Sequence, residues 1–517
     1  DTPILIIENG ETKYINIGEW IDSKIDNPDN KTLVEQFGPE DANMEMLGLF
    51  ENEAYIPTCY HDGKVIWGKM TNVSRHDSGD ILYEIVTKSG RKVKVTKSKS
   101  LIIWNDDKKE FVSIETDKVK IGDAVPVSMI LPAPPVSLKP YIKMSKYFDK
   151  KTTIFSRDLF RAKKMIGDSK KLPSDWYEDN NGTVFTLPYP NQKALRRTFN
   201  ESSSKVESMH PNCVYSFYGT KITAHIPDKF QLDSDNGIFI GLFLADGNAR
   251  TKQGDICITK KETGVVNFVK YWFEKFDINY RIDDRERKSS YDTYSVVGYS
   301  SILANFLEQI LSHGAEHKYV PDFAMTAPIE FAKGIISGYF SGDGSVDTNT
   351  KTIRVGSISE KLIQTLSNLC ARVGIFGKIS KINPTIENRG ENSKSYKTLK
   401  PSYVFYIRAK WAIKFKEEIV LVNEEKQEKL LSLDINQIEH MNFPTHNDIV
   451  LDKIVEINII PQEIVMSTYP KAYDVTVPET GLFSTGHFIH VANTSDTGYI
   501  ERRLVKSMED TKVYYDF

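Results

Sequence analysis

Two apolar runs, residues 239–247 and 336–344, both end in the dipeptide Asp-Gly. We expect each run to be a helix that stops at its glycine, because glycine readily adopts the positive φ of a helix C-terminal cap. Small residues four apart mark one face of each run and would let two helix backbones approach closely: Gly241 and Ala245, and Gly338 and Gly342. The pattern predicts a helix pair that brings Asp246 and Asp343 side by side.

Two carboxylates at helix C-termini are electrostatically unfavourable, because the negative ends of both helix dipoles face them. A divalent cation would neutralise the charge, and Mg²⁺ prefers hard oxygen ligands of this kind. Such a site suits metal-assisted phosphodiester hydrolysis. A single Asp-Gly is more often only a turn. Two of them, each heading the same sequence pattern, favour a metal site with Asp246 and Asp343 as ligands.

The elements that would position these aspartates appear twice between about 225 and 440. The alternation of apolar residues predicts helix, strand, helix, strand and helix in each copy, which indicates an internal duplication. After the first Asp-Gly we expect a strand at 255–259, a helix at 263–276, a strand at 294–297 and a helix at 300–311. After the second we expect a strand at 352–355, a helix at 360–373, a strand at 403–408 and a helix at 410–420.

The flanking segments, 1–130 and 451–493, have the short, regularly spaced strand patterns of an all-β domain. A hairpin is expected around Asn9-Gly10, since this dipeptide favours the tight turns of two-residue hairpins. Further strands are expected at 81–86, 92–96, 101–104, 454–460, 472–477 and 488–491. The simplest architecture is an all-β domain that is interrupted by an α+β insert and completed by strands from its C-terminal part.

Composition excludes several classes of protein. The net charge of −3 gives no global basicity, and the four cysteines form no Cys-x-x-Cys pair, which argues against a zinc knuckle and a disulfide framework. There is no apolar run of about 18 residues, so no membrane partner is expected. Residues 131–200 carry 14 Lys and Arg against 6 Asp and Glu. This segment is either a solvated basic face or a module that contacts DNA.

The paired runs resemble the signature of the LAGLIDADG homing endonucleases, with Asp246 and Asp343 at the positions of the family's metal-binding aspartates. His317-Lys318-Tyr319-Val320-Pro321 resembles the family's Lys-x-Ile-Pro block, so Lys318 matches a lysine implicated in catalysis. The resemblance implies a monomer with an internal pseudo-dimer, whose two saddle-shaped sheets bind a double-stranded DNA site. Lys410 and Lys414 are the candidates for the corresponding lysine of the second half.

The β segments resemble inteins, whose splicing unit is the Hint domain. Residues 1–6 are similar to the block after the first splicing nucleophile, which would lie upstream of Asp1. Residues 472–477 resemble the Tyr-Asp-x-Thr-Val block, which adds Asp474 to the candidate splicing residues. Residues 490–493 resemble the intein C-terminus. Asn493 would cyclise through its side-chain amide, and Thr494 would accept the acyl group.

Two histidines typical of inteins are replaced here. Ala492 stands where a histidine usually precedes the terminal asparagine, and Lys99 replaces the histidine of a Thr-x-x-His block. Lysine cannot relay protons near neutral pH as histidine can. Thr96 with backbone donors would then stabilise the reacting oxygen, and His487 and His490 are the nearby candidates to polarise the scissile carbonyl.

The last segment, 494–517, is similar to the bridge helix of the largest subunit of multisubunit DNA-directed RNA polymerases, of the eukaryotic, archaeal or viral kind. Tyr499, Arg502 and Arg503 fit its surface toward nucleic acid. The resemblance implies polymerase subunits and template DNA or RNA as partners of the host protein. It also implies a compartment inside the cell, either the nucleus or a viral or cytoplasmic one.

We therefore expect an intein that splices itself out of a polymerase precursor and whose insert cuts DNA with Mg²⁺. The expected parts are 1–130 and 451–493 for splicing, 131–225 as basic linker or DNA module, 226–440 for the endonuclease (halves about 226–315 and 316–440), and 494–517 for the host. One alternative is a degenerate insert that folds and binds DNA but neither cuts nor splices efficiently. Another is that the role of the gene product is simply that of the polymerase.

Overall fold

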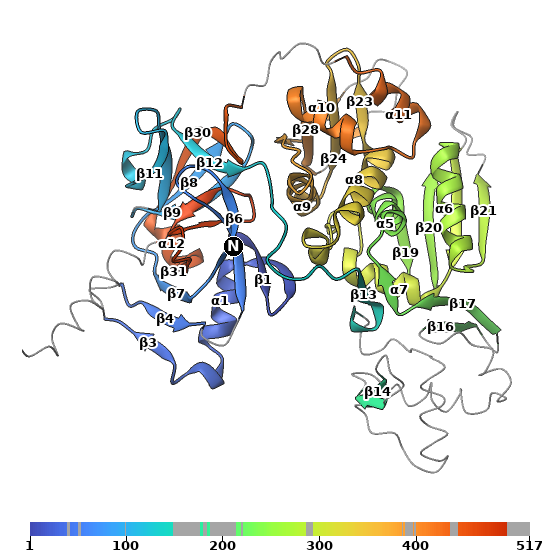
Figure 1. Cartoon of the computed structure of the whole chain (residues 1–517), viewed down its shortest axis with the longest axis horizontal. Coiled ribbons are helices and arrows are strands. Elements are labelled where there is room, and N and C mark those ends of the chain that lie inside the picture. The colour runs from blue at the N-terminus through green and yellow to red at the C-terminus, as the bar shows by residue number, and fades with distance from the viewer. Residues whose placement is uncertain are drawn as a thin grey trace, which may run out of the picture.

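A β-rich part and a mixed helical part lie side by side in the chain (Figure 1). The computed structural model describes residues 1–38, 42–49, 53–98, 100–147, 176–178, 184–186, 213–218, 221–285, 293–384, 386–387, 396–397, 400–434 and 443–493. Lys99, Thr494, Tyr499, Arg502, Arg503 and most of the basic segment lie outside these residues. The predictions made for them stay predictions.

The chain begins with the expected hairpin. Strand β1 (Pro3–Glu8) pairs with β2 (Glu11–Asn16) in a register that places Glu8 opposite Glu11. The turn residues Asn9 and Gly10 have φ of 50° and 76°, the positive values that a two-residue hairpin requires. The next element differs from the all-β prediction. Helix α1 (Ile17–Ile25) buries one face, with Trp20 and Ile21 at most 1% exposed, so its helical periodicity was missed.

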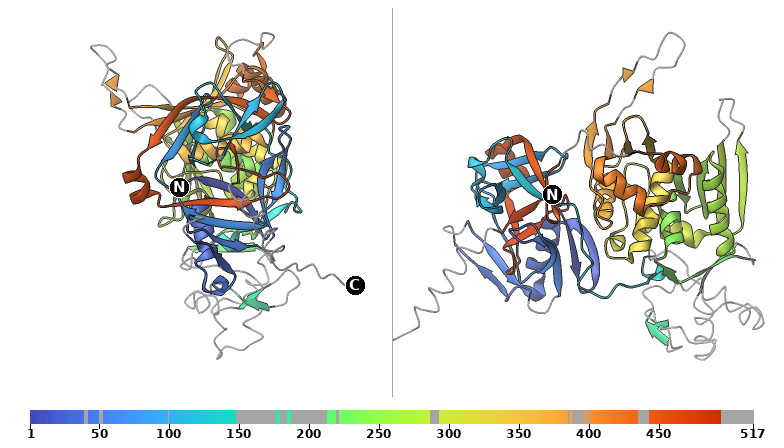
Figure 2. Two further views of the ribbon diagram at one scale, coloured as in Figure 1. Left: turned by 90° about the vertical axis from the view of Figure 1, so that its left-hand side faces the viewer. Right: turned by 45° about the horizontal axis from the view of Figure 1, so that its top comes forward.

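Strands from both ends of the chain share sheets. Strand β30 (Ile449–Ile460) pairs with β12 (Ala124–Ser128) on one side and β8 (Leu82–Thr87) on the other. Strand β31 (Lys471–Thr476) pairs with β7 (Asn72–Asp77). These pairings join segments that are separated by more than 300 residues of sequence, so the C-terminal strands complete the β-rich part, as Figure 2 also shows.

The other elements of the β-rich part are short. They are β3 (Val34–Gln36), β4 (Glu45–Gly48), β5 (Ala54–Cys59), β6 (Val65–Lys69), β9 (Lys92–Thr96), β10 (Leu101–Asn105), β11 (Glu110–Ile114), β29 (Thr445–His446), α12 (Gln462–Thr468), β32 (Leu482–Ser484) and β33 (His490–Ala492). The expected strands at 92–96 and 101–104 correspond to β9 and β10. Helix α12 was not expected.

The mixed part contains two copies of one arrangement, and each places two or more helices against a four-stranded antiparallel sheet. The sheet orders are β19-β20-β22-β21 and β23-β24-β28-β25, so matching positions carry matching strands. The first copy contains α5 (Ser234–Asp246), β19 (Gly247–Arg250), β20 (Asp255–Lys260), α6 (Thr263–Lys275), β21 (Tyr280–Arg285), β22 (Thr293–Tyr299) and α7 (Ser301–Leu311).

The second copy contains α8 (Ile329–Asp343), β23 (Ser345–Asp347), β24 (Thr352–Ser357), α9 (Glu360–Ala371), β25 (Lys378–Ile382), β28 (Ser402–Ile407), α10 (Ala409–Glu418) and α11 (Glu424–Leu431). The expected helices and central strands are present within a few residues. The sequence patterns missed the strand directly after each Asp-Gly helix, one further strand in each sheet, and α11. Short pairs complete the described chain: β13 (Tyr141–Lys143) with β18 (Lys229–Gln231), β14 (Trp176–Glu178) with β15 (Val184–Thr186), β16 (Cys213–Tyr218) with β17 (Lys221–Pro227), and β26 (Ile386–Glu387) with β27 (Tyr396–Lys397).

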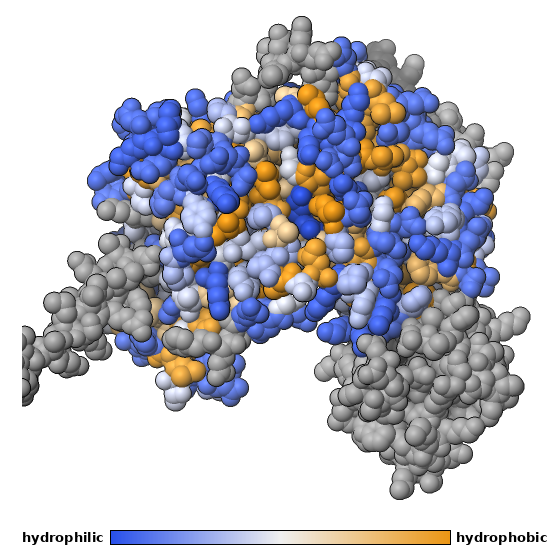
Figure 3. Space-filling view, in the orientation of Figure 1, coloured by the Kyte–Doolittle hydropathy of each residue, from blue (hydrophilic) through white to orange (hydrophobic). Residues whose placement is uncertain are grey.

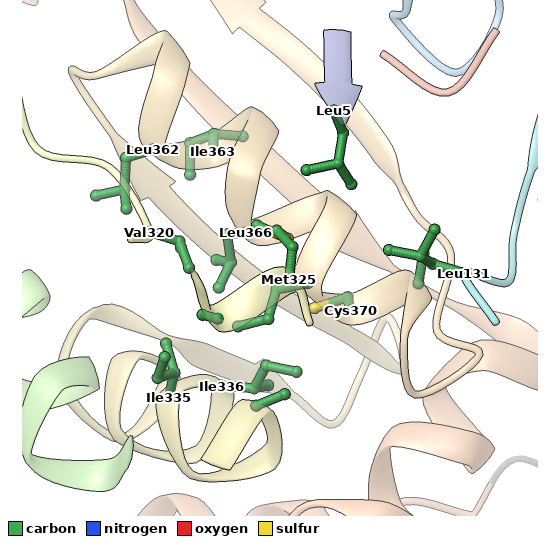
Figure 4. Packing of buried hydrophobic residues seen from close by; sticks show 14 of the residues in the cluster. Leu5, Leu131, Val320, Met325, Ile335, Ile336, Leu362, Ile363, Leu366 and Cys370 are labelled. Carbon is green, nitrogen blue, oxygen red and sulfur yellow. The ribbon is translucent and has the colours of Figure 1, made fainter. Parts of the chain in front are cut away.

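One hydrophobic core runs through both parts. Helix α9 contacts α8 through residues such as Ile335 and Ile336, and its other side approaches Leu5 and Leu131 of the β-rich part (Figure 4). On the face seen in Figure 3, hydrophilic residues dominate the rim and hydrophobic residues gather toward the middle. In the described part of the chain, no helix combines the length and apolar character needed to cross a bilayer.

Candidate functional site

The two Asp-Gly helices, α5 and α8, touch backbone to backbone. A Cβ atom on Gly241 would lie 2.3 Å from the carbonyl oxygen of Ile335, and one on Gly338 would lie 2.1 Å from that of Ile238. No side chain fits in such a space, so the helices can approach this closely only with glycine at these positions. The predicted close packing of the two helices is therefore confirmed.

The predicted reason for the Asp-Gly glycines is wrong. Gly247 and Gly344 have φ of −82° and −72°, which is extended backbone open to any residue. The constraint is space, because a Cβ atom would lie 2.5 Å from the carbonyl oxygen of Phe243 in one helix and 2.3 Å from that of Phe340 in the other. At both helix ends the chain turns toward the next strand, β19 or β23. In this turn the glycine lies against the last turn of its own helix, which leaves no room for a side chain.

The helix pair delivers Asp246 and Asp343 to one place. Desolvation between the helix ends, followed by the negative charge of Asp246, raises the pKa of Asp343 to about 6. Lys260, at the end of β20, forms an ion pair with Asp246, and its ammonium nitrogen lies 3.9 Å from an Asp343 oxygen. The carboxylates are adjacent, as expected. The positive charge beside them is the Lys260 ammonium, which no sequence pattern had predicted.

Two further lysines bind the ends of the same helices. The Lys318 ammonium donates to the carbonyl oxygens of Phe243, Leu244 and Gly247 at 2.8–3.0 Å. Lys426 donates to those of Ser341 and Gly342 at 2.9 and 2.6 Å. The carbonyls of Leu244, Ser341 and Gly342 lie in the last turns of the two helices, where the helix supplies no donor, so the ammonium groups satisfy them. Desolvation lowers the pKa of both lysines to about 8.

Lys318 therefore lies at the paired carboxylates, as its motif predicted. The two candidates for its counterpart do not. Lys410 donates to Thr445, and Lys414 pairs with Glu418 at 2.6 Å, both away from the helix ends. Lys426 takes that place instead. It lies on α11, a helix that sequence patterns missed because its residues are mostly charged, so no local signal could have identified it.

The donor set suits a hard cation that keeps part of its water shell. In the described residues no three His, Cys, Asp or Glu side chains come together to form a metal site. Two carboxylates with helix-end carbonyls nearby match the way Mg²⁺ is usually bound, through one or two carboxylates with water and substrate phosphates as the other ligands. Burial, and after it the negative charge of Asp246, raises the pKa of Asp343, and a cation bound here would offset both effects.

The candidate splicing residues surround a second feature, a cavity of about 110 Å³ in the β-rich part. Thr96 and Asp474 line it together with Ala492, the residue before Asn493. The Thr96 hydroxyl lies 2.7 Å from the Ser98 hydroxyl and 3.2 Å from that of Ser100. Asp474 is buried and accepts a hydrogen bond from the amide of Val475. The structure thus brings these two candidates close to Ala492, the residue that precedes Asn493.

His490 is buried and His487 is partly buried, and neither lines the cavity. Desolvation lowers the pKa of His487 to about 4 and that of His490 to about 3, so both rings are neutral at pH 7. His490 Nε2 lies 2.6 Å from the Ser128 hydroxyl. Asn493 is 9% exposed, its amide donates to the Gly481 carbonyl at 3.0 Å, and its side-chain nitrogen makes no hydrogen bond with the described residues.

Sequence reasoning missed one histidine. His76 on β7 lines the same cavity as Thr96 and Asp474. Its Nδ1 lies 2.8 Å from the carbonyl oxygen of Asp77, so Nδ1 is the donor in this contact. It pairs across the sheet with Ala472, two residues from Asp474. Only the strand pairing reveals this proximity, because nearly 400 residues separate the two segments.

Comparison with known proteins gives a family for the mixed part. Residues 233–311 and 330–420 match the family described as LAGLIDADG-like domain. The chain is 27% identical over 428 residues to the DNA-directed RNA polymerase subunit Rpo1C of Methanocaldococcus jannaschii. The matched region covers 82% of this chain and 39% of that protein. It is 24% identical to a DNA polymerase of Thermococcus hydrothermalis over 96% of this chain and 32% of that protein. The chain thus spans about a third of the length of these relatives.

Two kinds of solved structure are similar to parts of the chain. The transcription factor IIB Mvu mini-intein is 31% identical, covering 26% of this chain and 69% of that one, with a TM-score of 0.22. The protein I-DmoI, in a structure described as a complex with DNA and Mn, is 15% identical, covering 37% and 97%, with a TM-score of 0.26. The chain is thus an intein that carries a LAGLIDADG-like domain, in a sequence similar to a DNA-directed RNA polymerase subunit.

Proposed function

We propose that the mixed part is a site-specific DNA endonuclease and that the β-rich part splices the protein out of its precursor. The observation that carries the first half is the meeting of Asp246 and Asp343 at the ends of two helices in backbone contact. The two halves have the same sheet order and lie on either side of this pair, and we infer that a pseudo-two-fold axis relates the halves. Such an arrangement would let each half act on one strand of a DNA duplex.

The sheets offer a surface of the right chemistry for DNA. In the second half, Arg354, Tyr406 and Lys378 are cross-strand neighbours on one sheet row, and Arg354 is exposed. In the first half, Arg281 pairs across the sheet with Val297, and its side chain is 57% exposed. Arg and Lys contact phosphate oxygens, and aromatic and apolar neighbours contact base edges. Double-stranded DNA is therefore the proposed partner, and the enzyme is proposed to act as a monomer.

Asp246 and Asp343 would hold Mg²⁺, which would activate water and stabilise the leaving oxygen of the phosphodiester. Lys260 occupies the space between the carboxylates in the structure and would move aside or contact a phosphate when the metal binds. Lys318 and Lys426 hold the helix ends in place and bring positive charge toward the scissile phosphates. Their pKa of about 8 lets each donate or accept a proton near neutral pH.

Incubation of the protein with Mg²⁺ and a plasmid that carries the uninterrupted polymerase site tests the nuclease. We expect linear product from the unmodified chain and none from Asp246→Asn/Asp343→Asn. No linearisation by the unmodified chain, or equal cutting by the double variant, would overturn this half of the proposal. Replacement of Mg²⁺ by Mn²⁺ or Ca²⁺ in the same assay identifies the metal that supports cleavage.

For splicing, Asn493 is proposed to break the C-terminal junction. Its side-chain nitrogen would attack its own backbone carbonyl carbon, the peptide bond to Thr494 would break, and the amine of Thr494 would leave with a proton. The absence of a hydrogen bond on the Asn493 side-chain nitrogen, within the described residues, leaves that nitrogen free to attack. Thr96 and the nearby serines are proposed to stabilise the reacting oxygen at the upstream junction, and Asp474 to orient groups in the cavity.

A precursor with restored upstream residues and a different tag at each end tests splicing. We expect ligated tags and a free insert from the unmodified sequence, and no C-terminal cleavage from Asn493→Ala. Retention of splicing by Asn493→Ala would contradict the mechanism. Such precursors can be built from the parts proposed from the sequence. These are the Hint domain (1–130 with 451–493), the endonuclease (226–440) and the host segment (494–517).

One observation favours the degenerate alternative. His487 and His490 are neutral at pH 7 and lie outside the cavity, so neither supplies the protonated imidazole that would polarise the scissile carbonyl. An insert that folds and binds DNA without efficient splicing would leave full-length precursor in the tagged assay. In either case the host protein is proposed to be a DNA-directed RNA polymerase subunit, with other subunits and template nucleic acid as its partners.

A further inference from the structure

Helix α9 buries polar side chains as well as apolar ones. Its apolar residues Leu362 and Leu366 pack within the mixed part, yet Gln364 and Asn368 are only 5% and 0% exposed. A buried amide that lacks a partner costs free energy, so such side chains are retained only where they meet polar groups. Figure 4 shows that Leu5 of the β-rich part lies close to the same helix.

The partner of both amides is one carbonyl of the β-rich part. Asn368 Nδ2 donates to the Gly486 carbonyl oxygen at 2.8 Å, and Gln364 Nε2 donates to the same oxygen at 3.3 Å. Gln364 also donates to the Asn368 side-chain oxygen at 3.2 Å, which fixes the orientation of both amides. The Tyr14 hydroxyl is a third donor to Gly486, at 3.3 Å. Three donors from two segments, α9 and β2, therefore meet at this carbonyl.

Gly486 lies at the tip of the hairpin that leads to the splice junction. Strands β32 and β33 pair with Ser484 opposite His490 and Leu482 opposite Ala492, and the next amide, that of Asn493, donates to Gly481. The Gly486 amide donates to the carbonyl of Pro3 at 2.5 Å, so the same residue also holds the first strand, β1. Gly486 thus links the hairpin before Asn493 to the first strand of the chain.

Neighbouring contacts hold α9 against the β-rich part at a second point. Arg91, which is 2% exposed, donates to the Ser367 hydroxyl at 3.0 Å and to the Gly377 carbonyl at 3.1 Å. The turn before it approaches so closely that a Cβ atom on Gly90 would lie 1.9 Å from the carbonyl oxygen of Ile379. Because these contacts fix the helix, the two amides are rigid supports for Gly486 rather than flexible surface groups.

We propose that Gln364 and Asn368 are positioning residues for splicing, so that a helix of the endonuclease domain forms part of the support of the splice site. This inference rests on the proposed splicing activity. It predicts that the insert cannot be treated as a separable passenger, because without α9 the Gly486 carbonyl loses two of its three side-chain donors and the support that fixes its position. Neither residue contacts the reacting atoms, and both act through the register of the β32–β33 hairpin.

The test uses the full-length tagged precursor with Asn368→Leu, Gln364→Met and the double variant, which keep side-chain volume but remove the donors. We expect the splicing rate to fall about tenfold or more in the double variant, the effect of losing two buried hydrogen bonds. Among the products, the fraction of fragments cleaved at a single junction should rise and the fraction of released insert should fall. DNA cleavage by the same protein should stay within about twofold, because both aspartates are untouched.

Thr365→Val is the matched control. Thr365 is equally buried on α9, but its hydroxyl accepts the amide of Val320 and donates within its own helix, so it serves only the endonuclease. It should lower thermal stability or DNA cleavage without the selective loss of splicing. Equal splicing by the double variant and the unmodified precursor would overturn the proposal, and so would parallel losses of splicing and DNA cleavage.

Hydrogen–deuterium exchange keeps the two proposals distinguishable. In the unmodified chain the amides of residues 482–492 should be protected, and the double variant should exchange faster there with no change in β7 or β8. This difference is expected whether or not the precursor splices. Failure of the unmodified precursor to splice would overturn the proposed function alone, whereas unchanged exchange in the hairpin would overturn the role of the two amides.

Discussion

Gly338 and Ile238 meet across the two central helices so closely that a Cβ atom on Gly338 would lie 2.1 Å from the Ile238 carbonyl oxygen. This contact sets the distance between α5 and α8, and therefore the distance between the carboxylates at their ends. A helix pair spaced by ordinary side chains would place its axes 8–10 Å apart or more. The close pairing of Asp246 and Asp343 thus depends on glycine at the helix contact.

The first prediction is that Gly338→Ala separates the helices. The added methyl cannot be accommodated without a backbone shift, so we expect a loss of about 1–3 kcal/mol in the free energy of unfolding and a strong loss of DNA cleavage. Urea unfolding and plasmid linearisation measure the two effects. Gly356→Ala is the control, because its Cβ would meet its nearest atoms at an ordinary 3.4 Å. Equal behaviour of the two variants would contradict the close-packing argument.

The second prediction concerns the pH dependence of stability through Asp343. Its pKa is raised from 3.8 to about 6, so between these values the folded state binds more protons than the unfolded state, and the free energy of unfolding falls as pH rises. Asp343→Asn should remove this loss and stabilise the metal-free protein above pH 6. Because the side chain is 33% exposed, solvent screening reduces the expected gain to about 1 kcal/mol.

Urea unfolding of the metal-free protein at pH 4 and pH 7 checks this prediction. The difference between Asp343→Asn and the unmodified chain should shrink at pH 4 and reach its maximum at pH 7. Asp347→Asn is the opposite control, since hydrogen bonding from Thr350 lowers the pKa of Asp347. That variant should give no stabilisation at pH 7. A destabilised Asp343→Asn protein at pH 7 would show that the charge pair is compensated by Lys260.

The third prediction assigns Lys426 to the same role as Lys318. Lys426→Met removes the ammonium that binds the Ser341 and Gly342 carbonyls, so the end of α8 loses its cap and the site loses a positive charge. We expect DNA cleavage to fall by about 100-fold, comparable to Lys318→Met. Lys414→Met is the control, because Lys414 pairs with Glu418 away from the site and should cut within about twofold of the unmodified chain.

The fourth prediction separates three histidines in splicing. His487 and His490 have pKa values of about 4 and 3, so the splicing rate should show no titration by either between pH 5 and 8. His76 lines the cavity with Thr96, and His76→Gln should slow cleavage at the upstream junction. His61→Gln is the matched control, since that ring contacts the Phe111 carbonyl outside the cavity. An upstream cleavage rate that His76→Gln leaves unchanged would remove His76 from the mechanism.

The fifth prediction concerns the basic segment 131–225, most of which lies outside the described residues. If it is a DNA-contacting module, replacement of several Lys and Arg by Ala should weaken DNA binding and reduce its salt dependence. Binding isotherms at several salt concentrations measure the slope. An unchanged slope with unchanged affinity would leave this segment as a solvated basic face.

The sequence by itself determined the local elements and the main carboxylates. Helical periodicity predicted α5 and α8, the small residues on one face predicted their contact, and Asn9-Gly10 predicted the first hairpin. These features depend on residues within a few positions of one another, so pattern and propensity suffice to predict them. The same locality explains the misses, since α1 lies in a strand-rich segment and α11 is mostly charged.

Only the tertiary structure decided which distant residues meet at each site. Lys426 reaches the end of α8 from a helix more than 80 positions away, His76 reaches the cavity of Asp474 by strand pairing, and Asn368 reaches Gly486 across the two parts of the chain. No local pattern encodes such contacts, because they depend on how whole elements pack. The physical reason is that backbone carbonyls and buried charges take whichever donor the packed fold brings to them.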